Sequence, residues 1–424
     1  MKRRLFVTSA MTAVAAPAFS PRAASANDAV RVAVLGVNGQ GWEHVKGYQR
    51  LPNVEVATLC DPDRAVAARR AAEFEKAYGR KVRTETDLRR VFDDQGIDVV
   101  SIATPNHWHA LATIWACQAG KDVYVEKPGT HNVWEGRKVI EAAAKYNRIV
   151  QHGVQLRSSP ALQEAVEKLR AGVIGKVYLC RALVYRWRPS IGHFRGEPPP
   201  PELDYDLWQG PAQVRPFSRR WVHYNWHWQW DYGNGEIGNQ GIHQLDMAQW
   251  GLGVQLPRHI VAVGGKFVFD DDKETPEILT ALCSYPEQNQ MIEIAVRHWC
   301  TPGEQGVDVG NIFLGSEGYM LIRHYTAYET YLGQKREPGP KRLAEGDHFA
   351  NFLGAVRSRR KSEQNGPVET AHYSSALAHL ANISFRLGRR VEFDPARERF
   401  VADTEADRLL SRDYRAPFVV PERV

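Results

Sequence analysis

Cysteine is scarce in this chain, and its residues are far apart. The 424 residues contain five cysteines, an odd number without a C-x-x-C pair: Cys60, Cys117, Cys180, Cys283 and Cys300. This spacing argues against a disulfide framework and a cysteine-based zinc site, although it leaves room for one incidental bridge. His223 and His227 have the four-residue spacing of a helical metal pair, but no third ligand is evident nearby. We therefore expect no bound metal.

Long apolar runs and basic runs are missing after residue 26. No later stretch approaches the roughly 20 apolar residues that cross a bilayer, so we expect no membrane partner. Residues 1–26 hold four of the 55 basic residues and no acidic residue, which leaves 51 basic against 49 acidic residues in the remainder. This balance argues against electrostatic binding of nucleic acid and favours a small polar molecule as the partner.

Residues 1–26 have the pattern of a twin-arginine signal peptide. Basic residues 2–4 precede Leu5, Phe6 and Val7, a small apolar run follows, and residues 24–26 form an A-x-A cleavage site. We expect a periplasmic or secreted protein that is exported in the folded state. A cytoplasmic protein with a basic, alanine-rich start is the alternative.

From residue 27 to residue 155, short apolar runs alternate with helical patterns. The runs predict strands over residues 30–35, 54–59, 98–103, 122–125 and 149–152. Such alternation is typical of βαβ units, and continuously apolar strands fit a parallel sheet that is covered on both faces. The predicted fold is a doubly wound α/β domain.

The first two predicted strands end in residues that suit a dinucleotide. The turn after the first strand contains Gly36, Asn38, Gly39, Gln40 and Gly41, which let the backbone approach a pyrophosphate. Asp61 lies 20 residues after Gly41, the separation at which an acid binds ribose hydroxyls. A carboxylate repels a ribose phosphate, which favours NAD over NADP, although Arg64 is close. The glycines alone would also suit an ordinary loop.

Polar side chains follow the next two strands. The third strand is followed by Thr104, Asn106, Trp108 and His109, and the fourth by Glu126 and Lys127. Ligands of open α/β sheets bind beyond the carboxyl ends of the strands, so we expect these residues at the cofactor. Alternatively, Asn106 is a turn former or helix cap, and Lys127 is a solvated lysine paired with Glu126.

In these motifs, the chain resembles the Gfo/Idh/MocA family of oxidoreductases. The matches are the glycine turn at 36–41, T-P-N-x-x-H at 104–109, E-K-P at 126–128 and, more loosely, N-x-G-x-H at 239–243. Residues 203–212 and 347–353 agree with exported members. The resemblance implies a Rossmann domain over 27–155 and a substrate-binding and oligomerisation α+β domain over 156–424, built on a large open mixed sheet.

The resemblance also implies roles for single residues. Gly36, Gly39, Gly41 and Asp61 would hold NAD. Asn106 and Trp108 would border the nicotinamide, and Lys127 would touch the cofactor ribose and the reacting hydroxyl. The family's second sheet usually pairs with a copy of itself, so we expect a homo-oligomer.

Aromatic residues are concentrated in the predicted substrate half. They are Trp221, Tyr224, Trp226, Trp228, Trp230 and Tyr232. Aromatic faces stack on sugar rings, but rings of this kind also fill cores and subunit interfaces. The full set of substrate-binding candidates is Gln155, Arg157, Tyr224, His227, Trp230, Asn239 and His243. Gln155 and Arg157 could instead belong to a surface turn.

Asn239 occupies a position where the family usually has an aspartate, four residues before a histidine. An amide cannot take a proton, so an acid/base role would fall to His243, oriented by Asp246, or to Lys127. Asn239 could instead cap a helix.

We therefore expect reversible hydride transfer between tightly bound NAD and a carbinol of a sugar, sugar acid or cyclitol. Exported NAD has no ready recycling pool, so the reaction should return the cofactor to its starting redox state. One alternative is a glycoside hydrolase or lyase that oxidises a ring hydroxyl transiently and eliminates the glycosidic bond. A glycosidase branch of the family has E-V-P where this chain has Lys127, which argues against that branch. The second alternative is a non-catalytic sugar sensor.

Overall fold

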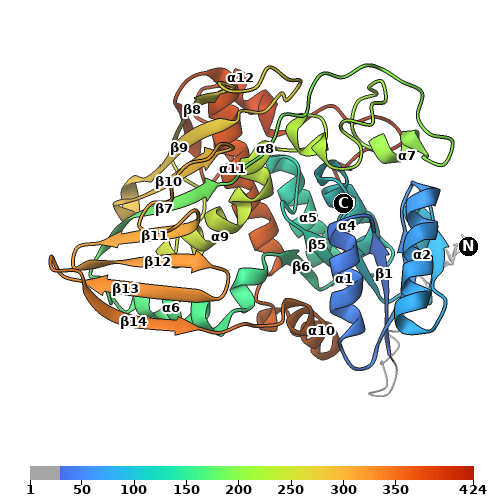
Figure 1. Ribbon diagram of the computed structural model, residues 1–424, viewed down its shortest axis with the longest axis horizontal. Helices are drawn as coiled ribbons and strands as arrows, with labels where there is room; N and C mark the ends of the chain where they lie inside the picture. The colour runs from blue at the N-terminus through green and yellow to red at the C-terminus, as the bar shows by residue number, and fades with distance from the viewer. Residues whose placement is uncertain (1–28) are drawn as a thin grey trace, which may run out of the picture.

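The computed structural model describes residues 29–424, so the predicted signal peptide lies outside the described residues. Residues 29–424 form two β-sheets that lie side by side, the larger at the left in Figure 1 and the smaller at the right. Within this part of the chain, no helix is both long and apolar enough to span a membrane.

The smaller sheet is a parallel Rossmann sheet, as predicted. Its strand order is β3-β2-β1-β4-β5-β6. The bounds are β1 Val30–Leu35, β2 Val54–Cys60, β3 Arg83–Glu85, β4 Val99–Ile102, β5 Asp122–Glu126 and β6 Val150–Gly153. The five predicted strands are confirmed. The edge strand β3 was missed because its sequence, R-T-E, has no apolar residue to mark it.

Helices cover both faces of this sheet. They are α1 Gln40–Gln49, α2 Arg64–Tyr78, α3 Leu88–Asp93, α4 Asn106–Gln118 and α5 Val133–Lys145. Along β1, Val32 and Val34 enter the apolar core on one face, and Ala33 and Leu35 enter the core on the other. Burial on both faces explains why the strands are apolar without alternation.

The larger sheet is mixed, with the order β14-β13-β12-β11-β7-β10-β9-β8-β15-β16. Strands β7 and β10 are parallel, and the other described pairs are antiparallel. The bounds are β7 Val177–Tyr185, β8 His259–Gly265, β9 Ile278–Tyr285, β10 Gln290–Arg297, β11 Val309–Gly315, β12 Gly318–His324, β13 Ala327–Leu332, β14 Glu337–Leu343, β15 Val391–Asp394 and β16 Arg399–Phe400.

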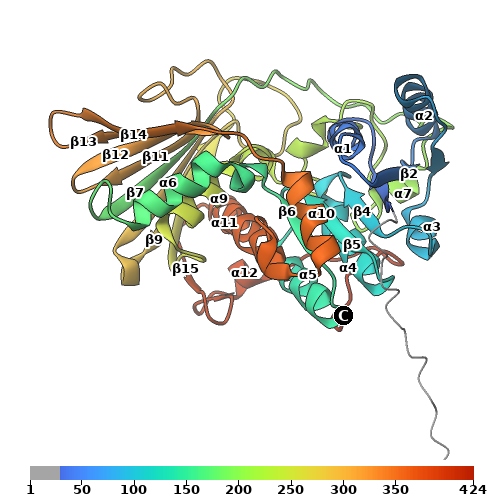
Figure 2. The ribbon, with the colours of Figure 1, turned by 90° about the horizontal axis from the view of Figure 1, so that it is seen from below.

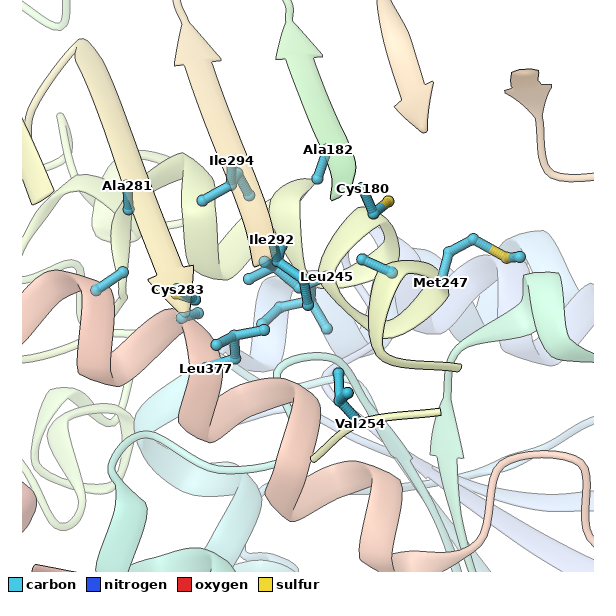
Figure 3. Close-up of a cluster of buried hydrophobic side chains, with 14 of the residues drawn as sticks. Cys180, Ala182, Leu245, Met247, Val254, Ala281, Cys283, Ile292, Ile294 and Leu377 are labelled. Atoms are coloured by element: carbon cyan, nitrogen blue, oxygen red, sulfur yellow. The ribbon is translucent and has the colours of Figure 1, made fainter. Parts of the chain in front are cut away.

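The main apolar core of the second half lies between one face of the larger sheet and three helices. Helices α6 Pro160–Arg170, α9 Gly241–Leu252 and α11 Val368–Leu387 lie on that face (Figure 2). Between sheet and helices, Cys180 of β7, Ile292 of β10, Leu245 of α9 and Leu377 of α11 belong to one buried cluster (Figure 3). Of the shorter helices, α8 Gly235–Asn239 and α12 Thr404–Asp407 contact α11, whereas α7 Tyr205–Gln209 packs against Trp108 of α4 in the Rossmann half.

After β14, and before the last two strands of the second sheet, the chain returns to the first sheet. Helix α10, His348–Ser358, places Phe352 and Leu353 in the same apolar core as Val32 and Val34 of β1. Near the C-terminus, Phe418 packs on the opposite face of the Rossmann sheet. The first sheet therefore takes part of its cover from residues after 345.

Candidate functional site

A cavity opens where the strand order of the first sheet reverses, between β1 and β4. Its volume is about 610 Å³, and residues of both layers line it. Open α/β sheets bind ligands at this position. The cavity brings together most of the predicted site residues: Gly36, Asn38, Gly39, Gln40, Asp61, Thr104, Asn106, Trp108, His109, Glu126, Lys127, Gln155, Tyr224, His227, Asn239 and His243.

Of the predicted site residues, Gly41, Arg157 and Trp230 lie outside this lining. The guanidinium of Arg157 forms two hydrogen bonds with the carboxylate of Asp246, at 2.7 and 2.9 Å. Asp246 also accepts a hydrogen bond from Ser374. His243 is not among its described hydrogen-bond partners, so the expectation that Asp246 orients His243 is wrong. Trp230 lies in a separate cavity, with the Arg386 guanidinium 5.3 Å from its ring centre.

The glycine turn forms a cradle that fits a dinucleotide. A Cβ atom on Gly41 would lie 1.9 Å from the carbonyl oxygen of Gly36, so only glycine allows the turn to pack against the start of α1. A Cβ on Gly39 would meet no atom within 4 Å, which shows open space above the turn. Gly39 precedes α1 without a side-chain cap, so the first amides of the helix are available to a pyrophosphate.

Asp61 holds the other end of the cradle. Its carboxylate accepts hydrogen bonds from the backbone amides of Val37, at 3.0 Å, and Asp63, at 3.1 Å. Burial raises the pKa of Asp61 to about 6, although these two hydrogen bonds act in the opposite direction. Arg64 donates to the carbonyl of Pro201, at 2.6 Å.

The raised pKa makes cofactor choice depend on pH. Above pH 6, the ionised Asp61 repels the ribose phosphate of NADP; below it, the neutral acid does not. We expect the ratio of the NADP and NAD dissociation constants to fall as the pH drops from 8 to 5. In the Asp61→Asn variant this side chain is neutral from pH 5 to 8. Its ratio of dissociation constants should therefore follow only the titration of the cofactor phosphate, near pH 6. Identical pH profiles for both proteins would contradict this prediction.

Glu126 is buried at the end of β5 and is tied to the first domain. Its carboxylate contacts His44, at 3.1 Å, and accepts from Gln155, at 2.9 Å. Burial acts to raise the pKa of Glu126, but the hydrogen bond and charge of His44, together with Lys127, lower it below its usual range. The negative charge of Glu126 is therefore stabilised by neighbouring side chains. Gln155, predicted at the substrate, lines the cavity and holds this carboxylate.

Lys127 reaches across the cavity to the second layer. Its Nζ donates to the side-chain oxygen of Asn239, at 3.1 Å, and the described contacts do not include an ion pair with Glu126. Burial lowers the pKa of Lys127, while Glu126 and Glu236 raise it. The Lys127 amine is thus held by an amide and is not a solvated lysine.

Asn239 connects Lys127 to a buried acid. It is the last residue of α8, and its amide donates to Glu236, at 3.3 Å. Glu236 is 1% exposed and accepts two hydrogen bonds from Arg188, at 2.8 and 3.0 Å. The carboxylate expected at position 239 therefore lies one helical turn earlier, linked to Lys127 through the Asn239 side chain.

His243, in α9, faces the same cavity. Burial and the charge of Lys127 lower its pKa to about 3, so the imidazole is neutral near pH 7. Its ring lies 4.9 Å from the ring of Tyr325, measured between centres. A neutral imidazole can accept a proton from a substrate hydroxyl.

The aromatic residues divide between core and cavity. Trp221 and Tyr232 belong to a buried cluster, and Trp228 is 2% exposed. Tyr224 and Trp226 line the cavity, and Tyr224 is 51% exposed. Core packing thus accounts for several rings, and Tyr224 is the most accessible for stacking on a ligand.

The lining also includes residues that the sequence did not predict at the site, among them Arg186, Arg188, Gln240 and Tyr325. Arg186 and Arg188 follow β7, and Gln240 separates α8 from α9. The alternating R-x-R pattern after a strand was a usable signal. Tyr325 carried none, because it lies in a turn between β12 and β13 that only tertiary folding brings to the site.

Comparisons with known proteins agree with this geometry. A family model described as "Oxidoreductase family, NAD-binding Rossmann fold" matches residues 30–154. A second, "Oxidoreductase family, C-terminal alpha/beta domain", matches residues 164–264 and 330–420. Both models are those of Gfo/Idh/MocA proteins.

Individual relatives give the same picture. The chain is 34% identical over 148 residues to scyllo-inositol 2-dehydrogenase (NAD(+)) of Bacillus subtilis, covering 35% of this chain and 42% of that protein. It is 30% identical over 154 residues to a glycosyl hydrolase family 109 protein of a Shewanella species, covering 35% and 34%. The matched segments thus span less than half of these relatives.

A solved structure shares the fold over nearly the whole described chain. It is the WlbA dehydrogenase of Bordetella pertussis in complex with NADH and UDP-GlcNAcA, with a TM-score of 0.65 and 18% identity. The match covers 86% of this chain and 99% of that one.

Proposed function

Because the chain belongs to the Gfo/Idh/MocA family of NAD-dependent oxidoreductases, we propose that it transfers hydride between bound NAD and a carbinol of a sugar, sugar acid or cyclitol. One observation carries the proposal: Lys127 and His243 line the same cavity as the dinucleotide cradle. A cation and a neutral base beside the cofactor site are what oxidation of a hydroxyl requires.

When bound, NAD would supply the hydride acceptor for the carbinol carbon. The cradle of Gly36, Gly39 and Asp61 would hold the cofactor. The His243 imidazole takes the hydroxyl proton, and Lys127 Nζ stabilises the developing alkoxide by charge and a hydrogen bond. Asn239 keeps the ammonium group aimed into the cavity. In the reverse direction, His243 returns the proton as hydride returns to the carbonyl carbon.

Absorbance of the bound nicotinamide tests the function. NAD-loaded protein is mixed with aldoses, ketoses, cyclitols, sugar acids and aryl glycosides while absorbance at the reduced-cofactor band and released products are followed. Reduction of bound NAD, reversed by a second sugar, is the expected result. Glycoside cleavage without a net redox change would favour transient oxidation and elimination, an alternative with which the glycosyl hydrolase relative is consistent. Binding without conversion would favour the sensor.

We also propose that the protein is exported with NAD already bound and works in the periplasm. The twin-arginine pattern of residues 1–26 supports export in the folded state. The reaction would then regenerate its own cofactor by coupling an oxidation to a reduction. Cell fractionation of a variant with Arg3 and Arg4 changed to lysine tests the route; undiminished periplasmic protein would contradict it.

A homo-oligomer through the larger sheet is a further part of the proposal. On the face away from the helices, Leu183, Ile312 and Leu321 form an apolar cluster, and Tyr319 and Tyr331 stack beside it. The three aliphatic residues are at most 3% exposed within one copy, so the surface offered to a second copy is that of the partly exposed tyrosine rings. Sedimentation equilibrium checks the state, and a monomer at all concentrations would contradict it.

A further inference from the structure

Arg186 is a cation without a counter-charge in the cavity. It directly follows β7, the strand that pairs with both β10 and β11 near the middle of the larger sheet. Its described hydrogen bond is to the side-chain oxygen of Gln240, at 2.9 Å, and its side chain is exposed to the cavity. Among residues 29–424, no carboxylate forms an ion pair with Arg186.

Lys127 is held by the neutral Asn239 amide and is assigned to the reacting hydroxyl, and the other charges in the cavity have partners. Arg188 is bound by the Glu236 carboxylate through two hydrogen bonds, and Glu126 is bound by His44. Asp61, at the nucleotide end of the cavity, accepts hydrogen bonds from backbone amides. One guanidinium fork is therefore free, and it lies on the substrate side of the cavity.

The position of Arg186 relates it to the reacting centre. Its partner Gln240 is the neighbour of Asn239, which holds Lys127. Arg186 and Lys127 both line this cavity.

We propose that Arg186 binds a carboxylate of the substrate, so that the substrate is a sugar acid. This inference rests on the proposed oxidoreductase function and narrows its substrate class. A guanidinium fork matches a carboxylate in a two-hydrogen-bond geometry. Because Lys127 is assigned to the alkoxide, Arg186 is the one guanidinium left for a charged substituent, and its single positive charge balances a carboxylate, whereas a phosphate monoester carries up to two negative charges at neutral pH.

Matched ligand pairs test the proposal. NAD-loaded protein is titrated with hexoses, the uronic and aldonic acids of the same hexoses, and their 6-phosphates, using calorimetry for affinity and nicotinamide absorbance for turnover. Wild-type protein should bind at least one acid about 100-fold more tightly than its neutral counterpart. Arg186→Gln should lower the affinity for the acid by about 10- to 100-fold, while the affinity for the neutral sugar stays the same. Arg186→Lys should recover part of the lost affinity.

Arg258→Gln is the matched control, because Arg258 is a surface arginine paired with Glu392. Its acid preference should equal that of wild type. Equal binding of acids and neutral sugars, loss of both in Arg186→Gln, tighter binding of the phosphates, or no binding of any acid would each overturn the carboxylate site. NAD content and melting temperature establish that Arg186→Gln is folded and loaded.

The two proposals fail differently. If neutral sugars are oxidised as well as acids, the oxidoreductase function stands and the carboxylate site is wrong. If acids bind through Arg186 but never reduce the nicotinamide, the site stands and the proposed reaction is wrong.

Discussion

Replacing Lys127 by alanine is expected to lower the rate of sugar oxidation by about 1,000-fold while NAD stays bound. The substitution removes the cation that Asn239 holds in the cavity, at 3.1 Å, and with it the stabilisation of the alkoxide. A positioned proton-transfer group typically contributes about 10² to 10⁴ in rate, and a donor to a developing oxyanion about 10² to 10³. Single-turnover reduction of bound NAD measures the loss.

Lys46→Ala is the control for the removal of a lysine charge. Lys46 is a half-exposed residue of α1 that pairs with Glu43, at 2.7 Å, away from the cavity. It should keep full activity. The cofactor released on denaturation should be equal in Lys127→Ala and wild type. A Lys127→Ala rate within threefold of wild type would remove this residue from the reaction.

Alanine at Gly39 and alanine at Gly41 should produce opposite defects. At Gly39, the added methyl group meets no protein atom within 4 Å and projects into the space for the pyrophosphate. We expect unchanged stability and an NAD affinity about 100-fold weaker, which corresponds to about 2.8 kcal/mol. Calorimetric titration of NAD-free protein measures the affinity.

At Gly41, the methyl group would collide with the carbonyl oxygen of Gly36, at 1.9 Å. Backbone must move to relieve this contact, and we expect a loss of about 3 kcal/mol in the free energy of unfolding, the upper range for overpacked sites. Denaturant unfolding of NAD-free protein measures it. Equal unfolding midpoints for the two variants would contradict the assigned roles.

Local signals accounted for the Rossmann layer. Apolar runs between helical patterns predicted β1, β2, β4, β5 and β6, because strands buried on both faces must be apolar throughout. The edge strand β3 and the exposed strand β14, whose sequence is E-P-G-P-K-R-L, gave no such signal. Their pairing depends on neighbours that the local sequence does not reveal.

The candidate site was predictable where motifs mark strand ends, and not where side chains choose distant partners. The turn at Gly36 and the lysine at 127 were found this way. By contrast, Arg157 was expected at the substrate but binds Asp246, 89 residues later. The link from Lys127 to Glu236 through Asn239 depends on a contact between layers. Competition among alternative polar partners is settled only in the folded chain.

The return of α10 to the first sheet limits how the nucleotide-binding half can be transplanted. A fragment ending at residue 155 would lack Phe352 and Leu353, and would leave the Val32 and Val34 side of β1 partly bare. An apolar sheet face exposed to water favours self-association. As a portable module for fusion or swapping, this half would have to carry α10 with it.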